Sequence, residues 1–298
     1  MPEPLPDWQN AFLEQHQLPL NFLESALKWF APVAALIAEH QVGAGRPILV
    51  AVNGSQGSGK TTLCDYLASC LENEHGLAAV SLSLDDFYLT RAQRQRLAAE
   101  VHPLLATRGV PGTHDMDLLA ATIEQLLSGL SPEIPRFDKS EDDRLPRDQW
   151  QSPSKGVDVI LLEGWCLGAT AQPEDELAPA VNPLESEEDP DGSWRRYANR
   201  ILGEAFPPLY ARVDEWIMLR APSFDSVYRW RLEQEHKLAS RSSGRGVMSD
   251  EQVARFIQFY QRITEQCLAR LPHQVNHLFS LDENRFVDSY MAAPGRRL

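Results

Sequence analysis

Residues Gly54 to Thr62 read GSQGSGKTT and match the pattern G-x-x-x-x-G-K-[ST]. In such a loop the glycines let successive backbone N–H groups turn inward, and with the start of the next helix they bind an anion. Lys60 would reach the β- and γ-phosphates of a nucleotide, and the Thr61 hydroxyl would bind Mg²⁺. The stretch predicts a nucleoside triphosphate site made by Gly54, Gln56, Gly57, Ser58, Gly59, Lys60, Thr61 and Thr62.

Acidic residues follow two apolar runs that have the pattern of strands. Asp85 and Asp86 follow AAVSLSL (78–84), and Glu163 follows VDVILL (157–162). A carboxylate at position 85 or 86 could accept a proton from an acceptor hydroxyl or bind Mg²⁺, or simply cap the next helix. Asp85 is nearer to the strand end and is our candidate base. Glu163 has the form of a Walker B acid, which holds Mg²⁺ directly or through water.

Two polar loops could shape a pocket for the acceptor, or could be ordinary surface loops. The first is RGVPGTHD (108–115), which contains Arg108 and His114 and runs into a helix that Asp115 could cap. The second is PRFDKSEDDR (135–144), which contains Lys139 and Arg144.

Arginines are concentrated in a segment that reads as two helices joined by a turn. The segment is 227–256, with Ser249 and Gln252 in the capping-box positions of the second helix. Arginines on a hinged hairpin suit a lid over about 227–250 that closes on a triphosphate and neutralises charge in the transition state. A solvated helix face is the alternative. Under the lid interpretation, Arg231 is a catalytic candidate beside Lys60, Asp85 and Glu163, and Arg241 is a nucleotide contact.

The elements that would position these residues alternate between strands and helices. Apolar runs at 47–52, 78–84, 157–162, 214–219 and 275–281 are separated by helical patterns, which indicates an α/β fold with a parallel sheet of the P-loop NTPase type, covered by helices on both faces. Ligands in such sheets bind beyond the carboxyl ends of the strands. Residues 8–42 predict two helices that Pro32 kinks or divides. We expect an N-terminal helical extension (1–46) and a P-loop domain (47–298).

Composition narrows the classes of partner. The 298 residues include 28 Lys and Arg against 42 Asp and Glu, a formal net charge of −14. That charge disfavours nucleic acids and anionic membranes as partners. Four cysteines without a C-x-x-C pair, no signal-peptide pattern and no apolar run of 18 residues predict a cytoplasmic protein with reduced thiols. Segment 171–193 has eight acids, four prolines and no Lys or Arg, so its composition predicts a surface loop.

Taken together, the motifs resemble the small-molecule P-loop kinases that include uridine kinase, phosphoribulokinase and bacterial pantothenate kinase. Asp85-Asp86-Phe87-Tyr88 is similar to the D-x-F-Y of uridine kinases, whose Asp is taken as the base, and PRFDKSEDDR resembles their acceptor loop. Still more similar is the plant-type D-glycerate 3-kinase family, over roughly 47–285. The shared strings are GSQGSGKTT, SLDDFYL, RGVPGTHD, PRFDKS, VNPLESEEDPDGSWRRY, APSFDSVYRWRLEQE and MSDEQV.

The resemblance implies an ATP- and Mg²⁺-dependent kinase of a small hydroxy acid, D-glycerate first. It also implies that part of the segment 181–197 is ordered. Another acceptor, such as pantothenate or a nucleoside, stays open, and so does a regulatory GTPase, although the guanine-binding string N/T-K-x-D is absent. The residues that the resemblance places on the acceptor are Asp85, Tyr88, Arg108, His114, Lys139 and Arg144.

Overall fold

The structure is a computed structural model that describes residues 5–241 and 248–293. Its centre is a sheet in the order β2-β5-β1-β6-β7-β8, in which the first five strands are parallel and β8 runs antiparallel to β7. The predicted parallel sheet is confirmed, and each of the five expected strands lies within two residues of its expected bounds. The strands are β1 (Ile48–Gly54), β2 (Ala79–Ser83), β5 (Val159–Gly164), β6 (Glu215–Arg220), β7 (His277–Leu281) and β8 (Val287–Ala292).

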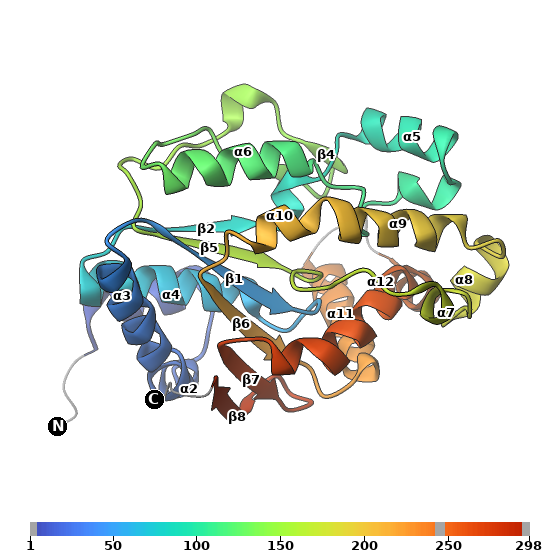
Figure 1. Ribbon diagram of the computed structural model, residues 1–298. Helices are drawn as coiled ribbons and strands as arrows, with labels where there is room; N and C mark the ends of the chain where they lie inside the picture. Colours follow the sequence, from blue (N-terminus) through green and yellow to red (C-terminus); the bar gives the residue numbers. More distant parts are fainter. Residues whose placement is uncertain (1–4, 242–247, 294–298) are drawn as a thin grey trace.

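Helices cover both faces of the sheet, as the sequence predicts (Figure 1). One face carries α1 (Asp7–His16), α2 (Asn21–Trp29), α3 (Ala31–Ala44) and α4 (Lys60–His75). The other carries α6 (Met116–Leu127), α9 (Ser193–Glu204) and α10 (Phe206–Tyr210). Beyond the carboxyl ends of the strands lie α11 (Phe224–Arg241) and α12 (Asp250–Arg270). The remaining short elements are α5 (Arg91–Glu100), α7 (Glu174–Leu177), α8 (Pro183–Glu188) and the single turns Leu84–Phe87, Pro103–Ala106, Arg147–Gln149 and Leu271–His273.

The N-terminal extension forms three helices, because the second of the two predicted helices is divided at Pro32, one of the two outcomes that the sequence leaves open. Pro32 lies in the first turn of α3, where its missing N–H leaves no hydrogen bond unmade, so it divides the helical stretch. The three helices pack on α4, and the ring of Tyr66 contacts those of Phe12 and Phe30. Within the described residues no single helix is both long and apolar enough to cross a membrane, and by length and composition alone the bent pair Asp7–His16 with Asn21–Ala44 passes that test.

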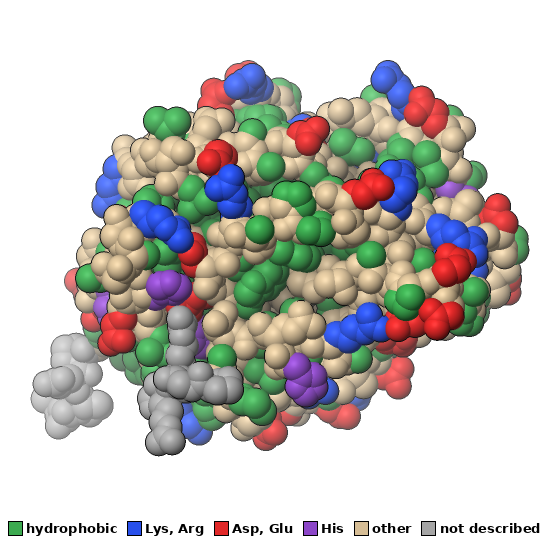
Figure 2. All heavy atoms as spheres, viewed as in Figure 1, with side chains coloured by type: hydrophobic (Ala, Val, Ile, Leu, Met, Phe, Trp, Pro, Cys, Tyr) green, Lys and Arg blue, Asp and Glu red, His purple; other side chains and the backbone are tan. Residues whose placement is uncertain are grey.

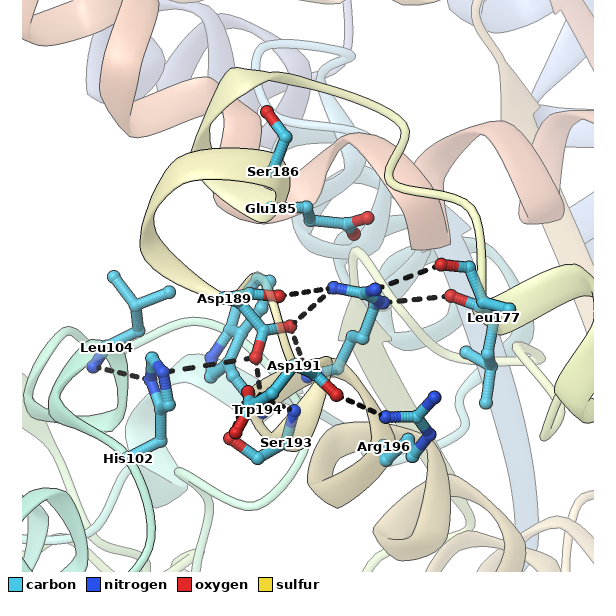
Figure 3. A network of polar contacts seen from close by, with 12 residues as sticks. His102, Leu104, Leu177, Glu185, Ser186, Asp189, Asp191, Ser193, Trp194 and Arg196 are labelled. Carbon is cyan, nitrogen blue, oxygen red and sulfur yellow. Dashed lines mark hydrogen bonds and ion pairs between the residues drawn. The ribbon is translucent and has the colours of Figure 1, made fainter.

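The segment 171–193, which by composition reads as a surface loop, is largely ordered. It contains α7 and α8, and the carboxylate of Asp189 is fully buried (Figure 3). Asp189 accepts hydrogen bonds from the backbone N–H of Trp194 at 2.8 Å and from the Arg195 guanidinium at 2.9 Å. The composition-based expectation is therefore wrong, because the cations that pair with this acidic stretch lie outside it in the chain.

Two further elements have no counterpart in the sequence prediction. The loop 135–144 contains a short hairpin, β3 (Phe137–Asp138) with β4 (Asp143–Arg144). Strand β8 is a half-exposed edge strand without the continuous apolar run that marks the inner strands. On the face shown in Figure 2, acidic and basic side chains are interspersed rather than gathered by sign.

Candidate active site

A cavity of about 410 Å³ lies beyond the carboxyl ends of β1 and β5, where the parallel sheet leads one to expect a ligand. It joins the phosphate loop, both polar loops and the helices α11 and α12. Its wall consists of Gln56, Gly57, Gly59, Lys60, Thr61, Thr62, Asp85, Tyr88, Arg108, Lys139, Trp165, Arg231, Gln234, Phe256 and Tyr260.

The phosphate loop connects the end of β1 to the start of α4 at Lys60. Two glycines are required by its shape: a Cβ on Gly54 would lie 2.5 Å from Ser58 Oγ, and Gly59 has φ of +89°, in the left-handed region. The hydroxyls of Ser55 and Ser58 are buried and have no hydrogen-bond partner within the described chain. Buried polar atoms of this kind are normally paired, so the loop is prepared for a ligand that supplies the partner.

Thr61 and Glu163 lie together beside Lys60. The Thr61 hydroxyl donates to Glu163 Oε1 at 3.0 Å, and Lys60 Nζ is 3.6 Å from Glu163 Oε2. Burial would lower the pKa of Lys60, but the carboxylates of Glu163 and Asp85 outweigh it and raise that pKa. Glu163 Oε2 is buried without a hydrogen bond from the residues that the structure describes. One hydroxyl and one under-satisfied carboxylate fit a Mg²⁺ that takes its other ligands from phosphates and water.

The structure separates the two adjacent aspartates. Asp85 lines the cavity, where Oδ2 accepts from Lys139 Nζ at 2.7 Å and Oδ1 from the Tyr88 hydroxyl at 2.8 Å. Asp86 turns away and accepts from Arg136 at 2.9 Å. Burial would raise the pKa of Asp85, but the ammonium groups of Lys139 and Lys60 outweigh it and lower the pKa below the ordinary value of a carboxyl.

His114 reaches the cavity only through Tyr88. The two rings are stacked with centroids 4.5 Å apart, and neither ring nitrogen of the buried His114 has a hydrogen-bond partner among the described residues. Burial lowers the pKa of His114 to about 4, so the imidazole is neutral at pH 7. His114 thus supports the ring whose hydroxyl holds Asp85.

The predicted acceptor cations fall into two groups. Arg108 and Lys139 line the cavity, and Arg108 Nη1 donates to Asp142 Oδ1. Arg144 is not part of the cavity wall, because its guanidinium donates to the Tyr88 carbonyl at 2.7 Å and to Asp115 at 3.1 Å. Arg144 therefore holds the backbone of Tyr88 in place.

Of the predicted lid residues, Arg231 lines the cavity and pairs with the buried Glu235 at 2.6 Å. Gln234, one helical turn further along α11, lines the cavity as well. The turn of the predicted lid (242–247) and the side chain of Arg241 lie outside the described residues.

Sequence reasoning missed three aromatic residues of the wall, Trp165, Phe256 and Tyr260. Two of them make hydrogen bonds to the first polar loop. The Trp165 indole donates to the Gly109 carbonyl at 3.1 Å, and the Tyr260 hydroxyl donates to the Arg108 carbonyl at 3.3 Å. Their rings are perpendicular, with centroids 4.8 Å apart. Together they fix the backbone that carries Arg108. Trp165 follows Glu163-Gly164 directly and could have been singled out, but no local signal distinguishes Tyr260 on α12.

A second cavity of about 390 Å³ borders the phosphate loop on the side of the N-terminal helices. Its wall is largely apolar and is contributed by three distant parts of the chain: the α1–α2 region, the loop with the start of α4, and the β7–β8 hairpin. These parts supply Leu18, Phe22, Phe30, Gly59, Thr62, Leu281, Arg285 and Phe286, among others, and Leu219 at the end of β6 adds to them.

Comparison with known proteins places the chain in a family. Residues 49–170 match the phosphoribulokinase/uridine kinase family model. An uncharacterized kinase of Schizosaccharomyces pombe, mug58, is 35% identical over 257 residues, which cover 81% of this chain and 90% of that protein. The chloroplastic D-glycerate 3-kinase of Arabidopsis thaliana is 33% identical over 72% of this chain and 46% of its own length. The solved D-glycerate 3-kinase of Cryptococcus neoformans is 26% identical, with a TM-score of 0.73 over 88% of this chain and 97% of that one. The chain therefore belongs to the phosphoribulokinase/uridine kinase family, in the group that contains the D-glycerate 3-kinases, and is a kinase that transfers a phosphoryl group to a hydroxyl acceptor.

Proposed function

We propose that the protein transfers the γ-phosphate of ATP to the 3-hydroxyl of D-glycerate and releases 3-phosphoglycerate and ADP. One observation carries the proposal: the cavity beside the phosphate loop holds a carboxylate, Asp85, together with the cations Arg108 and Lys139 on the acceptor side. A hydroxy acid needs a base at its hydroxyl and a cation at its carboxylate, and the two loops supply both. The names of two relatives point to the same acid.

The phosphate loop would hold the triphosphate, with backbone N–H groups and Lys60 on the phosphates. Thr61 and Glu163 would hold a Mg²⁺, which when bound neutralises charge on the phosphate oxygens. The second cavity continues from Gly59 and Thr62 into an apolar space, and we assign it to the adenine ring. Phe22 and Phe286 are then contacts of the base that the phosphate-loop motif alone does not predict.

In the transfer step Asp85 would accept the proton of the acceptor hydroxyl as its oxygen attacks the γ-phosphorus. Tyr88, stacked on His114 and anchored through its carbonyl by Arg144, orients the Asp85 carboxylate. Lys60 and Arg231 would stabilise the negative charge on the transferred group. Positioning and electrostatics account for most of the rate in such reactions.

The acceptor carboxylate would be bound by Arg108 and Lys139 rather than by Arg144. Arg108 offers a planar guanidinium suited to a carboxylate, and Trp165 and Tyr260 hold its backbone. Arg144 keeps the role of a positioning residue, because its donors already point at Tyr88 and Asp115.

The proposal is tested by ADP release with Mg²⁺-ATP and a panel of acceptors: D-glycerate, L-glycerate, pantothenate, uridine and none. We expect turnover with D-glycerate and none with pantothenate or uridine, and loss of turnover in Lys60→Ala. Product identity is checked by ³¹P NMR, which separates 3-phosphoglycerate from 2-phosphoglycerate. Turnover with uridine or pantothenate instead would show that one of these alternatives is the acceptor. GTP hydrolysis without any acceptor would favour a regulatory GTPase.

A further inference from the structure

Four cations line the active-site cavity within the described chain, and each is paired with a carboxylate. The pairs are Lys60 with Glu163, Arg108 with Asp142, Arg231 with Glu235 and Lys139 with Asp85. In the first three pairs the carboxylate lies outside the cavity wall. The fourth pair is different, because the partner of Lys139 is the candidate base itself, at 2.7 Å.

Lys139 is also the cation that can move most easily. Its side chain is 60% exposed, against 16% for Lys60, 24% for Arg108 and 19% for Arg231. Lys139 lies in the turn between β3 and β4, and among the described residues the ammonium group at the end of its long flexible side chain makes a single hydrogen bond, the one to Asp85. Its exposed ammonium group is open to an anion in the cavity, which can compete with Asp85 for it.

The same ion pair makes Asp85 a poor base. Lys139 occupies Oδ2 and Tyr88 occupies Oδ1, so both carboxylate oxygens already accept a hydrogen bond. A proton would have to be accepted beside an ammonium group that repels it. The ammonium groups of Lys139 and Lys60 offset the effect of burial and hold the pKa of Asp85 below its ordinary range, which weakens it further as a proton acceptor.

We propose that the acceptor activates its own base: the carboxylate of the incoming hydroxy acid takes Lys139 away from Asp85. Oδ2 of Asp85 is then free for the proton of the acceptor hydroxyl. The hydroxyl oxygen bonds to the γ-phosphorus, the bond from that phosphorus to the β–γ bridging oxygen breaks with its electron pair on ADP, and the proton moves to Asp85. This exchange rests on the proposed function, because it requires an acceptor that carries a carboxylate.

This exchange makes Lys139 a specificity-determining residue. An uncharged acceptor of the same shape would enter the cavity and leave Asp85 paired, so its hydroxyl would meet an occupied base. A water molecule in the cavity would likewise meet an Asp85 that is paired with Lys139. ATP is therefore protected from hydrolysis when no acceptor is bound. Selectivity for an acid then lies in kcat as well as in binding.

The test compares D-glycerate with its uncharged amide, D-glyceramide, by ADP release at saturating Mg²⁺-ATP. The variants are Lys139→Met, which removes the charge, and Lys139→Arg, which keeps it. Arg147→Met is the matched control, because Arg147 forms an exposed ion pair with Glu133 in the same segment, outside the cavity. A general base contributes about 10²–10⁴-fold, so for wild-type protein we expect the kcat for D-glyceramide to be lower by about 10²-fold.

In Lys139→Met we expect kcat for D-glyceramide, and ATP hydrolysis without acceptor, to rise about tenfold, a part of what a general base contributes. The KM for D-glycerate should rise in the same variant. The acidic limb of the D-glyceramide pH profile should move to higher pH, because loss of the ammonium raises the pKa of Asp85. Lys139→Arg and Arg147→Met should keep the wild-type ratio of the two kcat values.

Two results overturn the exchange. If Lys139→Met raises KM for D-glycerate and leaves kcat for D-glyceramide and acceptor-free hydrolysis unchanged, Lys139 only binds the carboxylate. If both kcat values fall by the same factor, Lys139 has a structural role. If wild-type protein does not phosphorylate D-glycerate, the proposed acceptor is wrong, and acceptor-free hydrolysis still decides the matter: an unchanged rate in Lys139→Met excludes the exchange.

Discussion

Asp85 can be tested against its neighbour Asp86, because only Asp85 lies in the cavity wall. We predict that Asp85→Asn lowers kcat by about 10²–10⁴-fold, the usual contribution of a general base, and leaves ATP affinity near that of the wild type. Asp86→Asn, whose side chain faces Arg136, should keep a kcat close to the wild-type value. Steady-state kinetics and ATP titration measure both. A collapse of ATP affinity in Asp85→Asn would show that Asp85 binds the metal and is not the base.

His114 gives a pH-dependent prediction at the same scale. Its pKa falls to about 4 in the folded protein, from about 6.5 in the unfolded chain. Between these two pKa values the unfolded state binds more protons than the folded state. His114 therefore makes the folded protein less stable as the pH falls through this range. We predict that, in urea unfolding, the free-energy difference between wild type and His114→Phe changes by about 3 kcal/mol between pH 7 and pH 4. A difference that is the same at both pH values would mean that the imidazole titrates normally.

At the scale of elements, the ordered acidic segment ties α8 to α12 through two ion pairs of very different burial. Glu185 and Arg262 are 1% and 9% exposed and share two short hydrogen bonds. Glu188 and Arg255 are 40% and 52% exposed with the same geometry. We predict that Glu185→Gln lowers the free energy of unfolding by about 3–5 kcal/mol, because the buried Arg262 loses its negatively charged partner and keeps only backbone carbonyls. Glu188→Gln should cost about 0–1 kcal/mol. Equal losses in urea unfolding would contradict a role for burial.

The helix α11 carries the prediction of a lid. Arg231 pairs with Glu235, and a triphosphate offers a competing partner. We predict that hydrogen exchange in 227–241 slows when a non-hydrolysable ATP analogue is added with Mg²⁺. The control is α6, which does not line the cavity and whose Leu119 and Ile123 are buried, and its exchange should stay the same. Unchanged exchange in both helices would remove the lid.

What the sequence predicts well is what local patterns determine. Continuous apolar runs mark the five parallel strands, and the glycine-lysine string marks the phosphate loop. What it misses depends on distant partners. The acidic segment reads as a loop because its cations lie outside it, and one of them, Arg262, lies 77 residues after Glu185. Tyr260 lines the cavity because α12 brings its hydroxyl to the Arg108 carbonyl. Arg144 matches the acceptor-loop pattern, but its direction is set by Tyr88 and Asp115.

At the scale of the whole molecule, the net charge of the chain and the cations of the active site have opposite effects on the binding of anions. The chain has a net charge of −14, and both ATP and an acid acceptor are anions. Among the described residues the cavity nevertheless gathers four cations, each paired with a carboxylate. Binding of anions therefore exchanges protein carboxylates for ligand oxygens around cations that are already in place.

The last prediction concerns the N-terminal helices as part of the whole. Phe12, Val33 and Ile37 are buried in the same core as α4 and β1, so the extension completes the core of the kinase. Losing even a few such side chains costs about 2–5 kcal/mol each, against a total stability of about 5–15 kcal/mol. We predict that residues 47–298 alone do not unfold cooperatively in thermal denaturation followed by circular dichroism.

A milder change separates stability from binding in the same region. Phe22 lines the second cavity, and Phe22→Ala should raise the KM for ATP while leaving the KM for the acceptor unchanged. The control is Leu27→Ala on the same helix, because Leu27 is 48% exposed and does not line either cavity beside the phosphate loop.

If the chain 47–298 folds cooperatively and binds ATP with wild-type affinity, the extension is a separate appendage. In that case the adenine ring must be bound somewhere other than the second cavity.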